Sequence, residues 1–413
     1  AENSRRRAQV GLRLDSTRGG SQWLFKADAF HGRDQFPDRR DGEWTEINVQ
    51  GRVTRELSRT GQLEVQSYYR REYRNVERQL THHLDTGDLD VQYSAQPSAR
   101  HAVVAGAGVR FNHDQTYGSP TLSFDPASRR YGLITAFAQD EFAVRPGSVF
   151  VTAGLKVERN SFSGADWQPN VRARWMAPHR QVFWGSVARA VRRPTRLDDD
   201  VRVTTESGVL LIQGGDTFES EEMVGWELGY RARPLPAMTL DVTTFGNRYG
   251  NLRSQDAPAV GVLPITLANT LIGKGRGVET SATVQPGLGW RVQASYTWLD
   301  TDITRAEGSR DVTGGASEAN DPGYLVTLRA GVSLPRNVEA DLWWRAVGAL
   351  PDPAVPAYAE LNARLGWRPN DRIELALVGQ DLLHARHPEF GAAVPQRVEF
   401  ERSVRATLSV RLP

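Results

Sequence analysis

The segment SVRATLSVRL, at residues 403–412, alternates between polar and apolar side chains at every position. A period of two residues predicts a β-strand with one apolar and one polar face. Arg405 and Arg411 lie on the polar face, and burying them inside a soluble sandwich would be costly. In a membrane β-barrel the apolar face meets lipid and the charged face meets a wet lumen. The segment therefore favours a strand of a membrane-spanning barrel.

The same alternation recurs along the whole chain, without a linker or a second domain. The period-two pattern predicts about nineteen strands. Their approximate bounds are residues 6–15, 21–32, 45–57, 62–75, 86–97, 101–113, 130–144, 147–160, 168–177, 180–191, 222–234, 236–250, 275–286, 289–303, 323–334, 337–348, 357–368, 372–383 and 402–412. We therefore predict an all-β fold, a transmembrane antiparallel up-and-down β-barrel that occupies residues 1–413 as one domain.

Two kinds of connection alternate between these strands. One kind is short and rich in Gly, Pro, Asn and Asp, which supply the backbone conformations of tight hairpin turns. The other is long and polar, at residues 33–44, 76–85, 114–129, 161–167, 192–221, 251–274, 304–322, 349–356 and 384–401. Short turns on one rim and long loops on the other are typical of outer-membrane barrels, whose short side is periplasmic. Tryptophans near strand ends fit the aromatic belts of such a barrel: Trp23, Trp175, Trp226, Trp298, Trp344 and Trp367.

The composition agrees with a barrel and argues against several other classes. The chain has 51 basic and 49 acidic residues, so it lacks the basic excess of a nucleic-acid-binding protein. No apolar run approaches the roughly 20 residues of a membrane helix. A membrane barrel needs no such run, because only every second strand residue faces lipid. The absence of cysteine excludes disulfides and thiolate chemistry.

Several motifs together resemble the C-terminal barrel of TonB-dependent outer-membrane receptors. The longest is WGSVARAVRRPT at residues 184–195, and HPEF at 387–390 matches the final hairpin of that barrel. The other motifs are FAQDEF at 137–142, WQPN at 167–170, WELGYR at 226–231, GRGVE at 275–279 and VGQDLL at 378–383. Their order and spacing over residues 130–412 carry the resemblance.

The resemblance implies a barrel of about 22 strands in the outer membrane of a Gram-negative bacterium, plugged from inside by an N-terminal domain. Such receptors import scarce nutrients, usually ferric siderophores, cobalamin, haem or glycans, with energy supplied through TonB. The implied partners are the TonB complex, outer-membrane lipid and lipopolysaccharide, and a small-molecule nutrient that can be a metal chelate. No nucleic-acid partner, no cofactor and no enzymatic activity are expected.

The chain departs from the family pattern at both ends. Residues 1–413 contain no plug and no TonB-binding segment, and an odd strand count differs from the even number of bacterial single-chain barrels. Residues 1–7 are not followed by the apolar segment of a signal peptide. If the protein is exported, we therefore expect residue 1 to be a mature or truncated start. We expect a fragment rather than a plugless barrel, because an open strand edge in lipid leaves backbone groups unpaired. The chain ends on Pro413, whereas family members commonly end on an aromatic residue.

Ligand contacts are expected in the long connections, because pockets combine aromatic faces with a few placed polar groups. The aromatic candidates are Tyr117, Phe124, Phe162, Trp167 and Phe218. A basic cluster runs from a strand end into the longest connection: Arg189, Arg192, Arg193 and Arg196. Guanidinium groups suit carboxylate and phosphate oxygens, so the cluster would attract an anionic ligand or lipopolysaccharide phosphates. The alternatives are packing of each aromatic within its loop, and pairing of the arginines with Asp198, Asp199 and Asp200.

Other arginines fall on the polar faces of predicted strands and would line the interior. They are Arg52, Arg172, Arg174, Arg231, Arg364 and Arg405. In a complete receptor they would hold the plug by ion pairs and hydrogen bonds.

The histidines give no prediction of a metal site. His82 and His83 are adjacent on an extended chain, so they point apart, whereas a tetrahedral site needs convergent ligands. His384 and His387 are expected to make structural hydrogen bonds. No HExxH or GxSxG motif is present. The alternatives to a receptor are a passive porin-like channel and a barrel enzyme with a loop-built site. A plug encoded upstream would support the receptor, and a signal peptide joined directly to Ala1 would support the channel.

Overall fold

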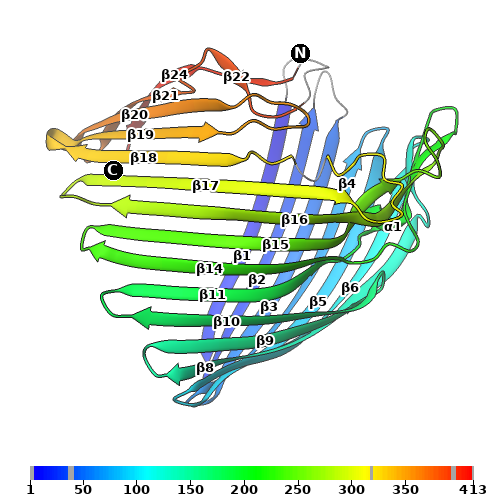
Figure 1. The fold of residues 1–413 in the computed structure, drawn as a ribbon, viewed down its shortest axis with the longest axis horizontal. Helices are drawn as coiled ribbons and strands as arrows, with labels where there is room; N and C mark the ends of the chain where they lie inside the picture. Colours follow the sequence, from blue (N-terminus) through cyan, green and yellow to red (C-terminus); the bar gives the residue numbers. More distant parts are fainter. Residues whose placement is uncertain (1–3, 36–40, 317–319, 392–396, 412–413) are drawn as a thin grey trace.

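The alternating segments form long paired strands that make up the wall of the molecule (Figure 1). The computed structural model describes residues 4–35, 41–316, 320–391 and 397–411. Within these ranges nineteen strands have eight residues or more, in agreement with the predicted number. These wall strands are β1 (Ser4–Arg18), β2 (Ser21–Gln35), β3 (Gly42–Ser58), β4 (Gly61–Val76), β5 (Leu80–Ser98), β6 (His101–Gly118), β8 (Ser128–Arg145), β9 (Val149–Asn160), β10 (Gly164–Ala177), β11 (Gln181–Arg192), β14 (Glu221–Leu235), β15 (Met238–Asp256), β16 (Ile265–Val284), β17 (Trp290–Arg305), β18 (Tyr324–Leu334), β19 (Val338–Val347), β20 (Tyr358–Asn370), β21 (Ile373–Gln380) and β24 (Ser403–Val410).

Each wall strand pairs antiparallel with the next wall strand along the chain, from β1 with β2 to β21 with β24. The sheet curls so that β1 to β6 pass behind β8 to β17 (Figure 1). The tight turns of β8 to β19 lie at one side of this view, and the longer connections with α1 (Arg196–Asp200) lie at the other. We call these the short-turn rim and the long-connection rim. The pairing confirms the predicted antiparallel up-and-down architecture.

The distribution of side chains is inverted relative to that of a soluble protein. Among the described residues, nine hydrophobic side chains are buried, against eighteen polar or charged ones. Val10, Leu12 and Leu14 of β1 are 52% to 70% exposed, and exposed apolar residues continue around the sheet. Exposed apolar surface on this scale is typical of a wall that meets lipid. We call this side of each wall strand the apolar face, and the opposite side the polar face.

Tryptophans of the apolar face lie near strand ends, as predicted. Trp23, Trp175 and Trp367 are exposed and lie a few residues from a tight turn at the short-turn rim. Trp226 and Trp298 are exposed on the same face, nearer to the long-connection rim. Two such levels suit the aromatic belts of a membrane barrel.

The prediction of long connections is wrong in four places, because strand makes up most of residues 76–85, 114–129, 161–167 and 251–274. β4 and β5 are joined by a turn at residues 77–79, and β9 and β10 by a turn at 161–163. At these strand ends polar residues interrupt the apolar alternation, whereas the backbone pairing continues. His82 and His83 consequently lie on β5 rather than in a loop.

The longest connection, residues 193–220, is folded against the rim rather than free. It contains α1, β12 (Val201–Thr204) and β13 (Leu210–Gln213). β12 pairs antiparallel with β7 (Leu122–Phe124), and β13 pairs parallel with β16. These elements enclose a small apolar cluster, formed by Val201, Phe218 and Leu267 with Leu122, Phe124, Val203 and Ile212. In the described part of the chain, no helix has the length and apolar character needed to cross a membrane.

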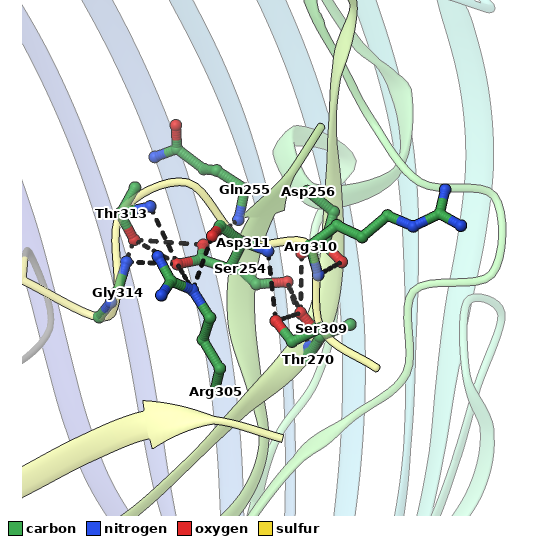
Figure 2. A network of polar contacts seen from close by, with 11 residues as sticks. Ser254, Gln255, Asp256, Thr270, Arg305, Ser309, Arg310, Asp311, Thr313 and Gly314 are labelled. Atoms are coloured by element: carbon green, nitrogen blue, oxygen red, sulfur yellow. Dashed lines mark hydrogen bonds and ion pairs between the residues drawn. The ribbon is translucent and has the colours of Figure 1, made fainter. Parts of the chain in front are cut away.

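A second connection, residues 306–316, is tied to the ends of β15 and β16 by the polar network shown in Figure 2. The buried carboxylate of Asp311 accepts a hydrogen bond from the backbone N–H of Gln255 at 2.8 Å. The hydroxyls of Thr270 and Ser309 lie 2.7 Å apart and join β16 to the same connection. Both connections therefore have defined positions above the wall.

Candidate functional site

A cavity of about 430 Å³ lies between the polar faces of β6, β8 and β9 and the start of the longest connection. Its lining combines cationic, amide and aromatic groups: Arg110, Asn112, Tyr131, Asn160, Phe162, Arg192, Arg193 and Arg196. Three arginines of the predicted basic cluster therefore meet here, together with Phe162. We call this space the rim cavity.

Arg196 fixes one side of the rim cavity. Its side chain is 6% exposed, and its guanidinium donates to Asp114 Oδ1 at 2.6 Å and to Asp200 Oδ2 at 2.7 Å. It also donates to the carbonyl of Pro126 and lies 5.2 Å from the ring centroid of Phe124. Because its donors are engaged within the protein, Arg196 anchors the connection to β6 and leaves little capacity for a ligand.

Arg192 and Arg193 differ in how firmly they are paired. Arg192 donates twice to Glu221, at 2.6 Å and 2.8 Å, and once to Asp198 at 3.1 Å. The nearest carboxylate oxygen to Arg193 belongs to Glu158, at 3.8 Å. The geometry thus supports the pairing alternative for Arg192, with Asp198 as predicted and Glu221 in addition. Arg193 is the most loosely paired arginine of the rim cavity.

Arg189, the fourth member of the predicted basic cluster, lies on the other face of the wall. Its guanidinium contacts Glu222 at 2.8 Å and lies 5.5 Å from the ring centroid of Trp167. Trp167 is exposed on the apolar face, so both residues point away from the rim cavity. The structure therefore divides the basic cluster between the two faces.

The remaining aromatic candidates are dispersed. Phe162 lines the rim cavity, with the guanidinium of Arg129 at 4.4 Å from its ring centroid. Phe218 is only 3% exposed and Phe124 packs beside it in the apolar cluster, which supports the packing alternative for both. Tyr117 is exposed at the end of β6, where its ring lies 5.9 Å from that of His83.

The adjacent histidines of β5 contact different partners. His82 Nε2 lies 2.9 Å from Asp114 Oδ2, whereas His83 packs between the rings of Tyr73 and Tyr117. Side chains that alternate across a strand cannot share a metal ion without a turn between them. The two histidines therefore point to opposite faces of β5.

Most of the polar-face arginines predicted to line the interior already have anionic or aromatic partners. Arg174 lies 3.4 Å from Glu141, Arg231 pairs with Asp241, and Arg364 reaches Glu339, Asp341 and Glu374. Arg172 lies 5.2 Å from the ring centroid of Trp184. Arg52 and Arg405 lie on the polar faces of β3 and β24. Contact of these arginines with a plug stays a prediction.

Sequence reasoning missed four residues of the rim cavity: Arg110, Asn112, Tyr131 and Asn160. Each lies on the polar face of its strand. Their position on the polar face could have been read from the period of two, but their convergence depends on strand register, which the alternation alone does not give.

The chain matches a family model described as TonB dependent receptor-like, beta-barrel, over residues 1–382. The chain belongs to the TonB-dependent receptor family. This confirms the family resemblance, and the wall strands are those of a TonB-dependent receptor barrel. The family is one of receptors and transporters of the Gram-negative outer membrane.

Individual relatives of this TonB-dependent receptor barrel are distant in sequence. The ferric enterobactin receptor PirA of Pseudomonas aeruginosa is 20% identical over 201 residues, which cover 44% of this chain and 27% of that receptor. The siderophore receptor PirA from Acinetobacter baumannii has a TM-score of 0.79 at 13% identity, covering 99% of this chain and 71% of that one. The copper transporter OprC has a TM-score of 0.75 at 12% identity, with coverages of 99% and 72%. Identities this low show a shared fold alone.

Proposed function

We propose that this barrel forms the wall of an outer-membrane importer that takes up a ferric siderophore with energy supplied through TonB. The observation that carries the proposal is the family match over residues 1–382. Similar proteins named ferric enterobactin receptor and siderophore receptor support an iron chelate as the cargo. A plug and a TonB-binding segment are the partners that this function requires.

The rim cavity is the proposed contact region for the chelate. Arg193 is one-third exposed there, and its loose contact with Glu158 leaves donors for an anionic oxygen. Tyr131 and Phe162 add aromatic faces at 5.2 Å from each other. Cationic and aromatic groups in one cavity suit a catecholate-type chelate, which presents both anionic oxygens and rings.

Uptake of a radiolabelled ferric siderophore tests the function in cells that carry the full-length gene. We expect uptake in TonB-competent cells and none in TonB-deficient cells. Equal uptake in both would overturn gated import and favour the passive channel.

Replacement of Arg193 tests the contact region. A hydrogen bond to a charged group contributes about 1.5–3 kcal/mol, so we expect Arg193→Ala to weaken siderophore binding by roughly 10- to 100-fold. Arg202→Ala is the matched control, because Arg202 is an exposed arginine of the same connection that pairs with exposed Asp125. Titration of intrinsic fluorescence with the ferric siderophore measures both affinities. Equal affinities of the two variants would remove the rim cavity from the proposal.

Outer-leaflet lipid is a further proposed partner, at the apolar face of β15 to β17. Arg248, Lys274 and Arg276 line a cavity of about 700 Å³ there, beside Trp226. Basic side chains just beyond an aromatic belt suit the phosphates of lipopolysaccharide. Asp300 pairs with Arg276 at 2.8 Å, and Asp302 in the same cavity would bridge to those phosphates through a divalent cation.

A further inference from the structure

The connection between β21 and β24 folds back over the polar face of β20. Within it, β22 (Arg386–Pro388) pairs with β23 (Glu399–Glu401). This brings His384 and His387 to Glu360, near the start of β20 at the long-connection rim. The three residues lie outside the rim cavity, and the proposed chelate import does not use them.

The geometry points to a binding site for a divalent transition-metal ion of the Zn²⁺ class, formed by Glu360, His384 and His387. Glu360 Oε1 contacts Nδ1 of His384 and lies 3.2 Å from Nδ1 of His387. One donor atom from each residue lies within 4.8 Å of the other two. Two imidazole nitrogens and one carboxylate oxygen form a donor set that binds Zn²⁺, with further positions left for water.

The burial of Glu360 and His387 is the second observation that supports the site. The Glu360 side chain is fully buried, and Nδ1 of His387 is buried without a hydrogen-bond partner among the described residues. A buried carboxylate and a buried imidazole nitrogen are costly unless both are satisfied. A metal ion bound to Oε1 and to both Nδ1 atoms would satisfy them together. The His384 side chain is 47% exposed, so the ion has a route from solvent.

The second ring nitrogen of His387 is already oriented for metal binding. Nε2 lies 2.9 Å from Glu389 Oε1, and Glu389 in turn pairs with Arg345. Metal-binding histidines commonly donate their other N–H to a carboxylate, which fixes the tautomer and the ring. Here the Nε2–H tautomer leaves the Nδ1 lone pair, 3.2 Å from Glu360 Oε1, available to a metal ion. The rings of Tyr358 and Phe400 pack against His387 and hold it in place.

The bound ion would fasten the last connection to the wall. Zn²⁺ bonds nitrogen and carboxylate oxygen at about 2.0–2.2 Å, so the three ligands would close around it by small movements of His384 and His387. Without an ion, the contacts of His387 with Glu360 and Glu389 would make the same link by themselves. These two arrangements differ in metal content, which can be measured.

The receptor purified from outer membranes, dialysed against a chelator and then loaded with ZnCl₂, provides the test. We expect the wild type to retain about one Zn²⁺ per chain by inductively coupled plasma mass spectrometry, and His384→Ala to retain none. His384 is half exposed, so this variant is expected to fold. His101→Ala is the control, because His101 also pairs with a carboxylate, Asp140 at 2.6 Å, but at the other rim.

Two further measurements keep the proposal falsifiable. Glu389→Gln leaves the three ligands intact and should weaken Zn²⁺ binding about 10- to 100-fold, as loss of a carboxylate behind a metal-bound histidine does. Visible absorption of Co²⁺-loaded protein should report nitrogen ligation in the wild type and lose that signature in His384→Ala. A wild type without bound metal, or a His384→Ala variant that retains it, would overturn the site and leave the metal-free arrangement. Neither result depends on siderophore uptake.

Discussion

At the scale of the residue, Arg196 is stable in its buried position because its guanidinium donates to two carboxylates and one carbonyl. We expect Arg196→Ala to leave buried Asp114 with His82 and buried Asp200 with Arg129 as the remaining partners, at a cost of up to about 3–5 kcal/mol. The loss should appear as faster hydrogen–deuterium exchange in α1 and β12, with the wall strands unchanged.

Arg202→Ala is the control for this prediction as well. Arg202 and Asp125 form an exposed pair at 3.1 Å, and such a pair contributes about 0–1 kcal/mol. Equal exchange in the two variants would show that Arg196 is not the anchor of the connection.

The pairing partners of the arginines were only partly predictable. Asp198 and Asp200 are close in sequence to Arg192 and Arg196, and proximity along the chain predicts those pairs. Glu221 and Asp114 come from other strands, so their pairing depends on register and on the path of the connection. The two histidines near Glu360 were expected only as hydrogen-bonding groups for the same reason.

At the scale of the element, Asp311 determines how residues 306–316 lie on β15 and β16 (Figure 2). Its buried carboxylate also accepts from the backbone N–H of Thr313 at 2.9 Å. We expect Asp311→Ala to free this connection, because several backbone N–H donors lose their acceptor. Each unsatisfied donor costs about 1–3 kcal/mol of stability. Limited proteolysis within residues 306–316 should accelerate.

Asp302→Ala is a suitable control, since Asp302 lies on the neighbouring strand β17 but on its apolar face. Both variants should keep the compact electrophoretic form of a folded barrel before heating. If Asp311→Ala is cleaved at the wild-type rate, backbone contacts rather than the Asp311 carboxylate hold the connection in place.

Elements of the wall were predictable wherever one face is apolar, as in β17 and β20. Prediction failed at residues 76–85, 114–129, 161–167 and 251–274. There the strands extend beyond the apolar band, so the alternation ends while the backbone pairing continues. α1, β12 and β13 were also missed. Each is short and depends on contacts with β7 or β16, which lie far away in sequence.

At the scale of the whole molecule, the wall presents apolar side chains outward and polar ones inward, with basic groups above an aromatic belt. We expect the double variant Lys274→Ala and Arg276→Ala to copurify with less lipopolysaccharide, because two contacts with lipid phosphate are lost. Lys26→Ala with Arg52→Ala removes the same charge from the polar face and should leave the bound lipid unchanged. Mass spectrometry of extracted lipid measures the amount of lipopolysaccharide bound per receptor chain in each variant. If both double variants lose the same amount of lipopolysaccharide, the lipid does not bind at Lys274 and Arg276.

The order of pairing in the sheet has a consequence for how the chain loses its conformational freedom. Strands such as β1 and β2 are joined by only two residues, Gly19 and Gly20, so bringing them together closes a very short loop. The contact between Asp114 and Arg196 instead spans 82 positions. Loop-closure entropy grows with the logarithm of that separation, so the wall is assembled from local steps. The entropic cost of long-range order is therefore concentrated in the contacts at the long-connection rim, the same contacts that shape the rim cavity.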